Sequence, residues 1–224
     1  GAKVNIKNIN KQTPLEIIMD KAHSRMDGAR GYHLEEEIRD SYQGIGLELL
    51  KNGAEISGNI GKKILQDAVG IGAKELVEML IEKGVSVKNG NIVGENPLLI
   101  ASRHKYTEIV NLLLSKGVNI NIVNDSGNTA LIESISPISV SDFSDASFIK
   151  LAKDNQKKLV ELLINLGADV NMSNINDETP VMKASESGNK EIVELLIKSE
   201  ASLKGSDIAG NNILIKACNS GNKE

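Results

Sequence analysis

The sequence has few aromatic residues, a single cysteine and no long apolar stretch. Aromatic residues make up 2% of its 224 residues and Trp is absent, so a core has to be built from aliphatic side chains. Cys218 stands alone, which excludes a disulfide framework and a cysteine-based zinc cluster. The apolar stretches fall far short of the roughly 20 residues that a membrane-spanning helix needs, so no membrane span is expected.

The chain also lacks an excess of basic residues. Lys and Arg number 26 against 30 Asp and Glu, and the formal net charge is −4. A duplex-binding protein normally carries a basic face, and a single-strand binder needs aromatic side chains on which bases stack. We therefore do not expect nucleic acid as a partner. Hydrophobic residues, at 40%, are sufficient for a folded core.

The sequence does contain an internal repeat. A short motif, Thr179-Pro180-Val181-Met182-Lys183-Ala184 in one copy, recurs in weakened form along the chain. Its aliphatic anchor falls at Leu15, Leu65, Leu98, Leu131, Val181 and Leu214. Successive anchors are 50, 33, 33, 50 and 33 residues apart. A second apolar motif, residues 191–197 in one copy, follows in the same phase, so the two motifs form one repeating unit.

Each unit carries the residues of two short helices. Pro14, Pro97 and Pro180 stand at the expected first helical position, where the N–H that proline lacks has no helical partner anyway. The residues just before that position are good N-caps: Thr13, Asn96, Thr129, Thr179 and Asn212. The second motif has helical spacing and is followed by a turn, usually led by glycine. Neither helix can bury its apolar stripe alone, so neighbouring units must stack.

A 33-residue unit of turn, helix and helix with a Thr-Pro-Leu-x-x-Ala entry resembles the ankyrin repeat. The resemblance covers the whole chain and implies an all-α solenoid of stacked helix-turn-helix units with β-hairpin-like finger turns. It implies a single domain, 1–224, with repeats at about 6–57, 58–90, 91–123, 124–173, 174–206 and 207–224, the last truncated. Two interpretations of the ends stay open: a piece of a longer array, or degenerate terminal repeats.

The chain departs from the family pattern in three ways. The histidine that usually follows Thr-Pro-Leu is missing from every copy. The resemblance implies that this histidine links neighbouring repeats through hydrogen bonds, so reduced stability is expected. Lys105 and Glu200 stand where glycine is expected, and a positive φ there costs of order 1 kcal/mol. The link before Leu65 is two residues short, which predicts an abbreviated finger turn in the second repeat.

The two 50-residue spacings indicate insertions between the paired helices, at about 20–43 in the first repeat and 136–155 in the fourth. Both are expected to protrude from the same edge of the stack. In the second, a helix start at Ser144 or Asp145 predicts an extended outer helix through Phe148 to Leu163. Insertions in repeat proteins often form a functional face, and tolerated surface loops are the simpler alternative.

No catalytic constellation emerges from the sequence. His23, His33 and the carboxylates of residues 35–37 come nearest to a metal site, but their spacing does not enforce one. Cys218 follows the small Ala217 in a helical segment, which predicts a buried structural thiol and not a nucleophile. We therefore expect no enzyme activity, no metal and no cofactor. A metal-dependent site in the insertions is the alternative from another functional class.

The resemblance implies that a partner lies along the finger turns and the inner helices. One turn position holds isoleucine in four copies, Ile9, Ile92, Ile175 and Ile208, which predicts an apolar ridge interrupted by Asn59 and Asp125. The alternative is that each isoleucine packs on the next finger turn. Where the inner helices end, Arg103, His104, Tyr106 and Glu186 are candidate binding residues. The first three combine cationic and aromatic groups, which are enriched in binding hot spots.

The sequence therefore predicts a non-enzymatic, monomeric interaction scaffold that binds a partner protein through a concave groove and its finger turns. The identity of that partner is not encoded in the sequence pattern. A targeting module of a larger enzyme or effector is a second interpretation of the same array. The sequence shows no signal-peptide pattern and does not specify a location; a cytoplasmic one is favoured, with secretion into a host as the alternative.

Overall fold

The structure, a computed structural model, describes residues 3–28, 32–88, 96–137 and 146–219. Eleven helices lie in this part of the chain: α1 (Pro14–Gly28), α2 (Tyr32–Lys51), α3 (Gly58–Gly70), α4 (Lys74–Glu82), α5 (Pro97–Arg103), α6 (Thr107–Ser115), α7 (Ala130–Ser134), α8 (Ala146–Asn165), α9 (Pro180–Glu186), α10 (Lys190–Lys198) and α11 (Ile213–Asn219). In the same residues, an isolated bridge between Val123 and Thr129 is the only β-type pairing. The expected all-α fold is confirmed.

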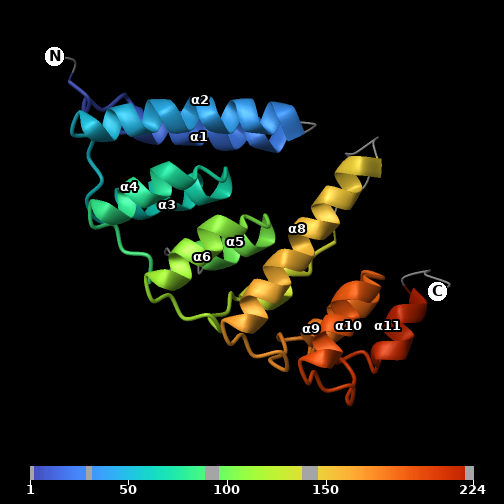
Figure 1. The fold of residues 1–224 in the computed structure, drawn as a ribbon. Coiled ribbons are helices and arrows are strands. Elements are labelled where there is room, and N and C mark those ends of the chain that lie inside the picture. Colours follow the sequence, from blue (N-terminus) through green and yellow to red (C-terminus); the bar gives the residue numbers. More distant parts are fainter. Residues whose placement is uncertain (1–2, 29–31, 89–95, 138–145, 220–224) are drawn as a thin grey trace.

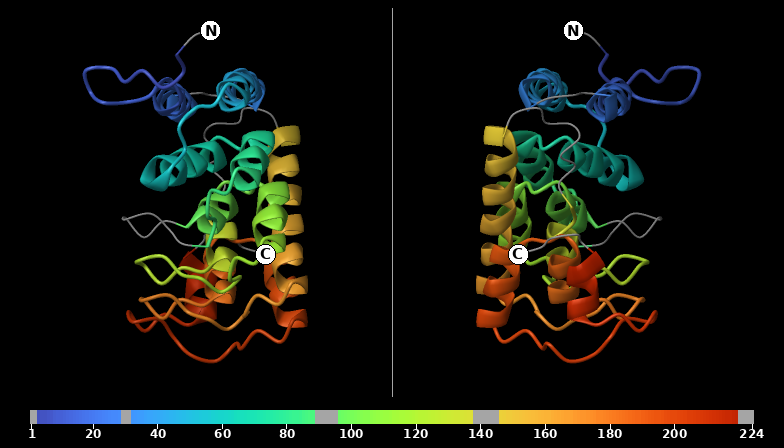
Figure 2. Two further views of the ribbon diagram at one scale, coloured as in Figure 1. Left: turned by 90° about the vertical axis from the view of Figure 1, so that its left-hand side faces the viewer. Right: turned by 90° about the vertical axis from the view of Figure 1, so that its right-hand side faces the viewer.

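The helices form a stack of pairs (Figure 1). The first helix of each repeat, called the inner helix, is α1, α3, α5, α7, α9 or α11, and the outer helices are α2, α4, α6, α8 and α10. Each inner helix contacts the inner helix of the next repeat, and each outer helix packs on its own inner helix. Figure 2 shows the segments that join successive repeats projecting from one side of the stack. The arrangement is the solenoid that the repeat predicts.

The core consists of the aliphatic anchors and the outer-helix leucines that pack on them. Five anchors, Leu15, Leu65, Leu98, Leu131 and Val181, are at most 1% exposed. The matching outer-helix residues Leu80, Leu113, Leu163 and Leu196 are fully buried. Burial of one such side chain stabilises a fold by roughly 1.5–3 kcal/mol, so these rows supply much of the driving force for stacking. The sixth anchor, Leu214, is 73% exposed.

The predicted N-caps form at the starts of the inner helices. The side chains of Asn96, Thr129, Thr179 and Asn212 accept hydrogen bonds from backbone N–H groups two or three residues later. At Thr13 the pattern is reciprocal, because the Thr13 N–H donates to the Glu16 carboxylate at 2.8 Å while the Glu16 N–H donates to Thr13 Oγ1 at 3.4 Å. These caps satisfy N–H groups that have no partner within the helix.

Lys105 and Glu200 adopt the left-handed conformation that the repeat predicts for them, with φ of 62° and 66°. In other repeats the equivalent positions are glycines, for example Gly72 (φ 73°) for Lys105 and Gly167 (φ 90°) for Glu200. Two further residues, Lys11 (φ 62°) and Asp177 (φ 57°), share this conformation inside finger turns and were not predicted. The tertiary stack therefore imposes the glycine geometry even where glycine is absent.

The insertions lengthen helices. In the first repeat α1 and α2 run for 15 and 20 residues, and the predicted outer helix of the fourth repeat, α8, begins at Ala146 and continues for 20 residues. Typical outer helices such as α4 have 9 residues. In Figure 1 the long helices extend on the side opposite the repeat-joining segments, which agrees with protrusion from one edge.

The second finger turn is abbreviated, as predicted, because Ser57 leads directly into α3. The expectation of a buried Cys218 is wrong: its side chain is exposed. At the equivalent position of the earlier repeats, Met19, Val69 and Ser102 are fully buried. Cys218 differs because no described repeat lies beyond α11.

Candidate partner-binding surface

One repeated hydrogen-bond pattern builds the finger turns. Seven residues before the anchor, an Asn or Asp side chain accepts hydrogen bonds from the backbone N–H groups two and four residues later. The described examples are Asn8, Asn124, Asn174 and Asp207, with hydrogen bonds of 2.8–3.0 Å. This Asx-turn chemistry replaces backbone pairing and fixes the shape of each turn. It was not predicted, although an Asn or Asp at a fixed offset from the anchor was a visible signal.

The residue that follows each turn-forming Asn or Asp lies at the tip of the finger turn. Ile9 is 98% exposed, Ile208 69% and Ile175 66%, so these three side chains do not pack into the next finger. Asn59, one of the two predicted interruptions, lies inside α3. Ile92 lies outside the described residues.

The tips of the last two finger turns are held by their neighbours. The N–H of Ile175 donates to the carbonyl of Ser126, and the N–H of Ile208 donates to the carbonyl of Asn176, both at 3.0 Å. Each tip is therefore anchored through its backbone to the preceding finger turn while its side chain faces solvent. Such a surface loses little conformational freedom when a partner covers it.

Asparagine side chains also supply hydrogen bonds between repeats, the role that the resemblance gives to the missing histidine. The side-chain oxygens of three asparagines accept from backbone N–H groups of the next repeat: Asn5 from Glu55 (2.7 Å), Asn121 from Asp169 (2.9 Å) and Asn171 from Ser202 (2.7 Å). The linking hydrogen bonds have thus moved from the inner helices to the segments that join the repeats.

Arg103 lies at the end of α5 and forms an ion pair with Glu133 of α7. Its Nε is 2.9 Å from Glu133 Oε2, and the carboxylate is almost fully buried. Asn124 and Asn128 donate to the other carboxylate oxygen at 2.8 and 3.1 Å. Three donors thus meet this buried carboxylate, and the Arg103–Glu133 ion pair joins the third repeat to the fourth.

The aromatic ring of Tyr106 packs between repeats. A Cβ placed on Gly72 would lie 2.8 Å from the ring, and the Tyr106 hydroxyl donates a 3.4 Å hydrogen bond to the carbonyl of Gly70. Burial raises the pKa of Tyr106 to about 12. The ring of His104, on an exposed residue, stacks on Tyr106 at 5.6 Å between centroids. The structure brings Arg103, His104 and Tyr106 together, and His104 is the exposed member.

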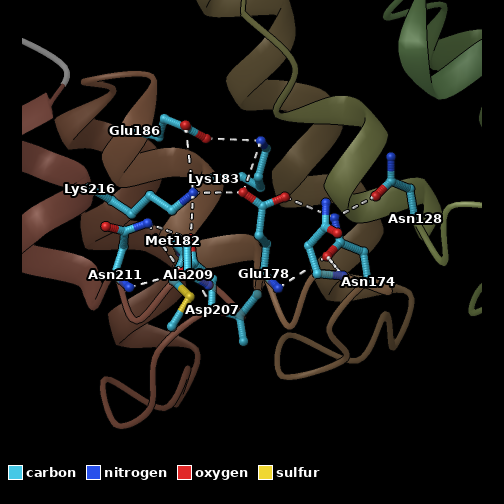
Figure 3. Close-up of polar contacts among 12 residues, drawn as sticks. Asn128, Asn174, Glu178, Met182, Lys183, Glu186, Asp207, Ala209, Asn211 and Lys216 are labelled. Carbon is cyan, nitrogen blue, oxygen red and sulfur yellow. Dashed lines mark hydrogen bonds and ion pairs between the residues drawn. The ribbon is translucent and has the colours of Figure 1, made fainter.

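Glu186 lies beside a network of charges around Lys216 (Figure 3). The Lys216 ammonium is 2.7 Å from Glu178 Oε1, 3.0 Å from Asp207 Oδ2 and 3.6 Å from Glu186 Oε1. Lys183 is 2.9 Å from Glu186 Oε2. These contacts join the inner helices α9 and α11 to the last finger turn. They were not predicted, because no sequence pattern pairs side chains that are 38 residues apart, as Lys216 and Glu178 are.

The network shifts the pKa values of its members. Burial disfavours the charge on Lys216, but its hydrogen bonds to Glu178 and Asp207 outweigh burial and raise its pKa. The hydrogen bonds of Asp207 with Asn211, together with Lys216, lower the pKa of that carboxyl. For Glu178 burial acts in the opposite direction, yet the hydrogen bonds with Lys216 and Asn174 lower its pKa. All three groups are therefore charged at neutral pH.

The pKa of another carboxyl, that of Asp67, is raised and not lowered. Burial of Asp67, on α3, raises its pKa to about 6, against the opposing effects of Lys63 and His23. Its Oδ2 atom is buried and makes no hydrogen bond. A buried oxygen of this kind destabilises the charged form. Asp67 therefore makes the fold sensitive to pH near the junction of the first two repeats.

The candidate metal ligands do not converge in the part of the chain that the structure describes. No group of three or more His, Cys, Asp or Glu side chains there is placed to hold a metal ion. His23 is exposed on α1, and the His33 side chain lies outside the described portion. Within the same residues, no helix is both long and apolar enough to cross a bilayer.

The chain is similar to proteins that carry ankyrin repeats. A family model described as "Ankyrin repeats (3 copies)" matches residues 41–124 and 148–224, which is more than half of the chain. An ANK repeat-containing protein, nipk-1, of Caenorhabditis elegans is 31% identical over 73% of this chain and 25% of its own length. The B-cell lymphoma 3 protein homolog of Mus musculus is 31% identical over 58% of this chain and 25% of its own length. The chain spans about a quarter of each of these relatives.

Proposed function

The chain belongs to the ankyrin-repeat family, and we propose that it is a non-enzymatic scaffold that binds a partner protein through its finger turns and the adjoining groove. Ankyrin repeats are generally protein–protein interaction modules, so a protein is the expected kind of partner. A stack of repeats presents a broad, preformed surface, which reduces the ordering cost of binding.

The exposure of Ile175 and Ile208 at neighbouring tips is the observation that carries this proposal. Both isoleucines lie at equivalent positions and are about two-thirds exposed, and their backbone N–H groups donate hydrogen bonds to carbonyls of the preceding finger turn. Large aliphatic side chains held in water on a rigid backbone indicate a surface that a partner covers. Burial of one isoleucine contributes about 1.5 kcal/mol or more to binding.

Two polar side chains at the C-terminal ends of inner helices belong to the same proposal. Glu186 is exposed on α9, and its carboxylate is shared between Lys183 and Lys216. His104 is exposed at the end of α5. A carboxylate and an imidazole on the inner helices would give a bound protein polar contacts in addition to the aliphatic contacts at the finger turns. Ile92 belongs to the same proposal by its sequence position alone.

The test is a comparison of protein capture by matched variants. The double variant Ile175→Glu/Ile208→Glu removes the two tips, and Leu166→Glu changes a side chain of similar exposure (48%) just after α8. The proposal predicts that a protein captured by the wild type binds the double variant on the order of 100-fold more weakly, since two contacts of about 1.5 kcal/mol are lost. Leu166→Glu should bind as the wild type does. Circular dichroism checks that all three proteins are folded.

Equal capture by the wild type and the double variant would contradict a partner site at the finger turns. Binding that is lost only with Leu166→Glu would move the site to the outer helices. The alternatives of a metal-dependent site in the insertions and a targeting module of a larger enzyme gain no support from the described residues.

A further inference from the structure

The last two helices, α10 and α11, expose aliphatic residues whose equivalents in earlier repeats are more deeply buried. The anchor Leu214 is 73% exposed, whereas the five other anchors are at most 1% exposed. On the preceding outer helix, Ile197 is 46% exposed, while its equivalents Ile81, Leu114 and Ile164 are partly buried against the core. These side chains follow the core pattern of the repeat, yet they face solvent.

The exposed residues surround one groove between α10 and α11. Its volume is about 900 Å³. We call it the end groove, and its apolar lining includes Val193, Ile197, Leu203, Ile213, Leu214 and Ala217. Leu203 adds a further exposed side chain, at 52%. The aliphatic part of the groove thus comes mainly from α10, α11 and the segment that joins them, and residues of α8 and α9, among them Lys157 and Ser185, complete the lining.

The earlier repeats show what covers a surface of this kind. Helix α6 packs on its own inner helix α5 and on the preceding outer helix α4. Helix α8 lies in the same way on α7 and α6, and α10 lies on α9 and α8. In each of these repeats the outer helix covers the surface formed by its own inner helix and the preceding outer helix. The equivalent surface formed by α11 and α10 is the end groove. Under the covering outer helices Val77, Val110 and Val160 are fully buried, whereas their equivalent Val193 is only partly so.

Charge adds a second requirement for the occupant. Lys74, the first residue of α4, is 2.9 Å from Glu108, the second residue of α6. Lys157 of α8 is likewise 3.1 Å from Glu191, the second residue of α10. Lys190 stands 33 residues after Lys157, at the rim of the end groove. An acidic residue in the first turn of an incoming helix would therefore meet Lys190 as its equivalents meet Lys74 and Lys157.

We propose that the end groove is a second binding site, distinct from the finger turns, whose occupant is an amphipathic helix of the outer-helix type. Its aliphatic residues have the spacing of Ile192, Leu195 and Leu196, and a carboxylate stands in its first turn near Lys190. Aliphatic burial supplies the affinity, and the Lys190 pair sets the register of the helix.

The experiment supplies such a helix in covalent form. Residues 220–224 have the same sequence as residues 187–191, so nine residues that copy 192–200, added after Glu224, complete a second copy of the α10 sequence. We expect the melting temperature to rise by about 5 °C or more, because the added helix buries the groove. The fluorescence of a dye that binds exposed apolar surface should fall. A control extension with Ser and Asn in place of Ile, Val and Leu should change neither quantity.

Two variants of the extended chain test whether the groove itself is responsible. Ile197→Asp changes a groove residue, and Leu166→Asp changes one of similar exposure outside it. The proposal expects Ile197→Asp to cancel the rise in melting temperature and Leu166→Asp to preserve it. An equal effect of the apolar and control extensions, or a rise that survives Ile197→Asp, overturns the proposal. So does sedimentation of the unextended chain as a dimer that Ile197→Asp dissociates, since the groove would then hold a second copy.

Discussion

Replacing Glu200 by glycine should stabilise the protein, although it removes a side chain and adds no contact. Glu200 follows α10 with φ of 66°, and its N–H and that of Ala201 close the helix by donating to the carbonyls of Ile197 and Leu196. An L-residue in this conformation costs about 1–2 kcal/mol. The greater freedom of glycine in the unfolded chain offsets about 0.5–1 kcal/mol. The net expected gain for Glu200→Gly is therefore roughly 0.5–1 kcal/mol.

A matched pair of variants separates backbone strain from loss of the carboxylate. Glu200→Ala removes the charge but keeps a Cβ, so its free energy of unfolding should increase little. At the equivalent position of the second repeat, Gly84 has φ of 91° and a Cβ added there would meet no atom within 4 Å. Gly84→Ala should therefore destabilise by about 1 kcal/mol through the backbone alone.

Thermal and urea unfolding, followed by circular dichroism, measure these differences. One kcal/mol corresponds to a shift of about 2–4 °C in the melting temperature of a protein of this size. If Glu200→Gly is no more stable than Glu200→Ala, the left-handed backbone at this position carries no strain and the reasoning fails. If Gly84→Ala is neutral, the same conclusion holds for the second repeat.

Two further predictions concern charged groups. Lys216→Met leaves Glu178 and Asp207 without their shared cation and should lower the free energy of unfolding by about 2 kcal/mol. Adding Asp207→Asn should recover part of that loss, because it removes one of the two unpaired carboxylates. An unchanged urea midpoint for Lys216→Met would argue against the ion pairs. For Asp67, burial raises the pKa from 3.8 to about 6, so the folded state favours the protonated carboxyl and this contribution to stability is lost as pH rises from about 4 through 6. In Asp67→Asn the fall in the urea midpoint between pH 4 and pH 7 should be smaller than in the wild type. An equal fall in the variant and the wild type would assign the pH dependence of stability to other groups.

The local geometry of the repeat could be predicted from the sequence, because residues at equivalent positions of different copies adopt the same backbone conformation. Thr179 caps α9 as Thr129 caps α7, and Lys105 and Glu200 take the φ that glycine takes elsewhere. The same comparison could have revealed the Asx turns, because Asn8 and Asn174 stand at one offset from their anchors.

The candidate surface could be predicted only in part. The positions of Ile175 and Ile208 in the finger turns follow from the repeat, and both side chains are exposed. The grouping of Arg103 and His104 with Tyr106 also follows from the sequence. Their different environments do not, because Glu133 and Gly72 reach them from neighbouring repeats.

The sequence by itself determined the period, the capped starts of the inner helices and two of the strained turn positions, Lys105 and Glu200, since these follow from short segments whose chemistry recurs. Only the tertiary structure decided which of the equivalent residues are covered. Leu214 has the same type and repeat position as Leu98, yet one is 73% exposed and the other is buried. Cys218 is exposed, and Lys216 is buried among three carboxylates. Burial in a solenoid is supplied by the neighbouring repeat, so a residue's own segment cannot specify it.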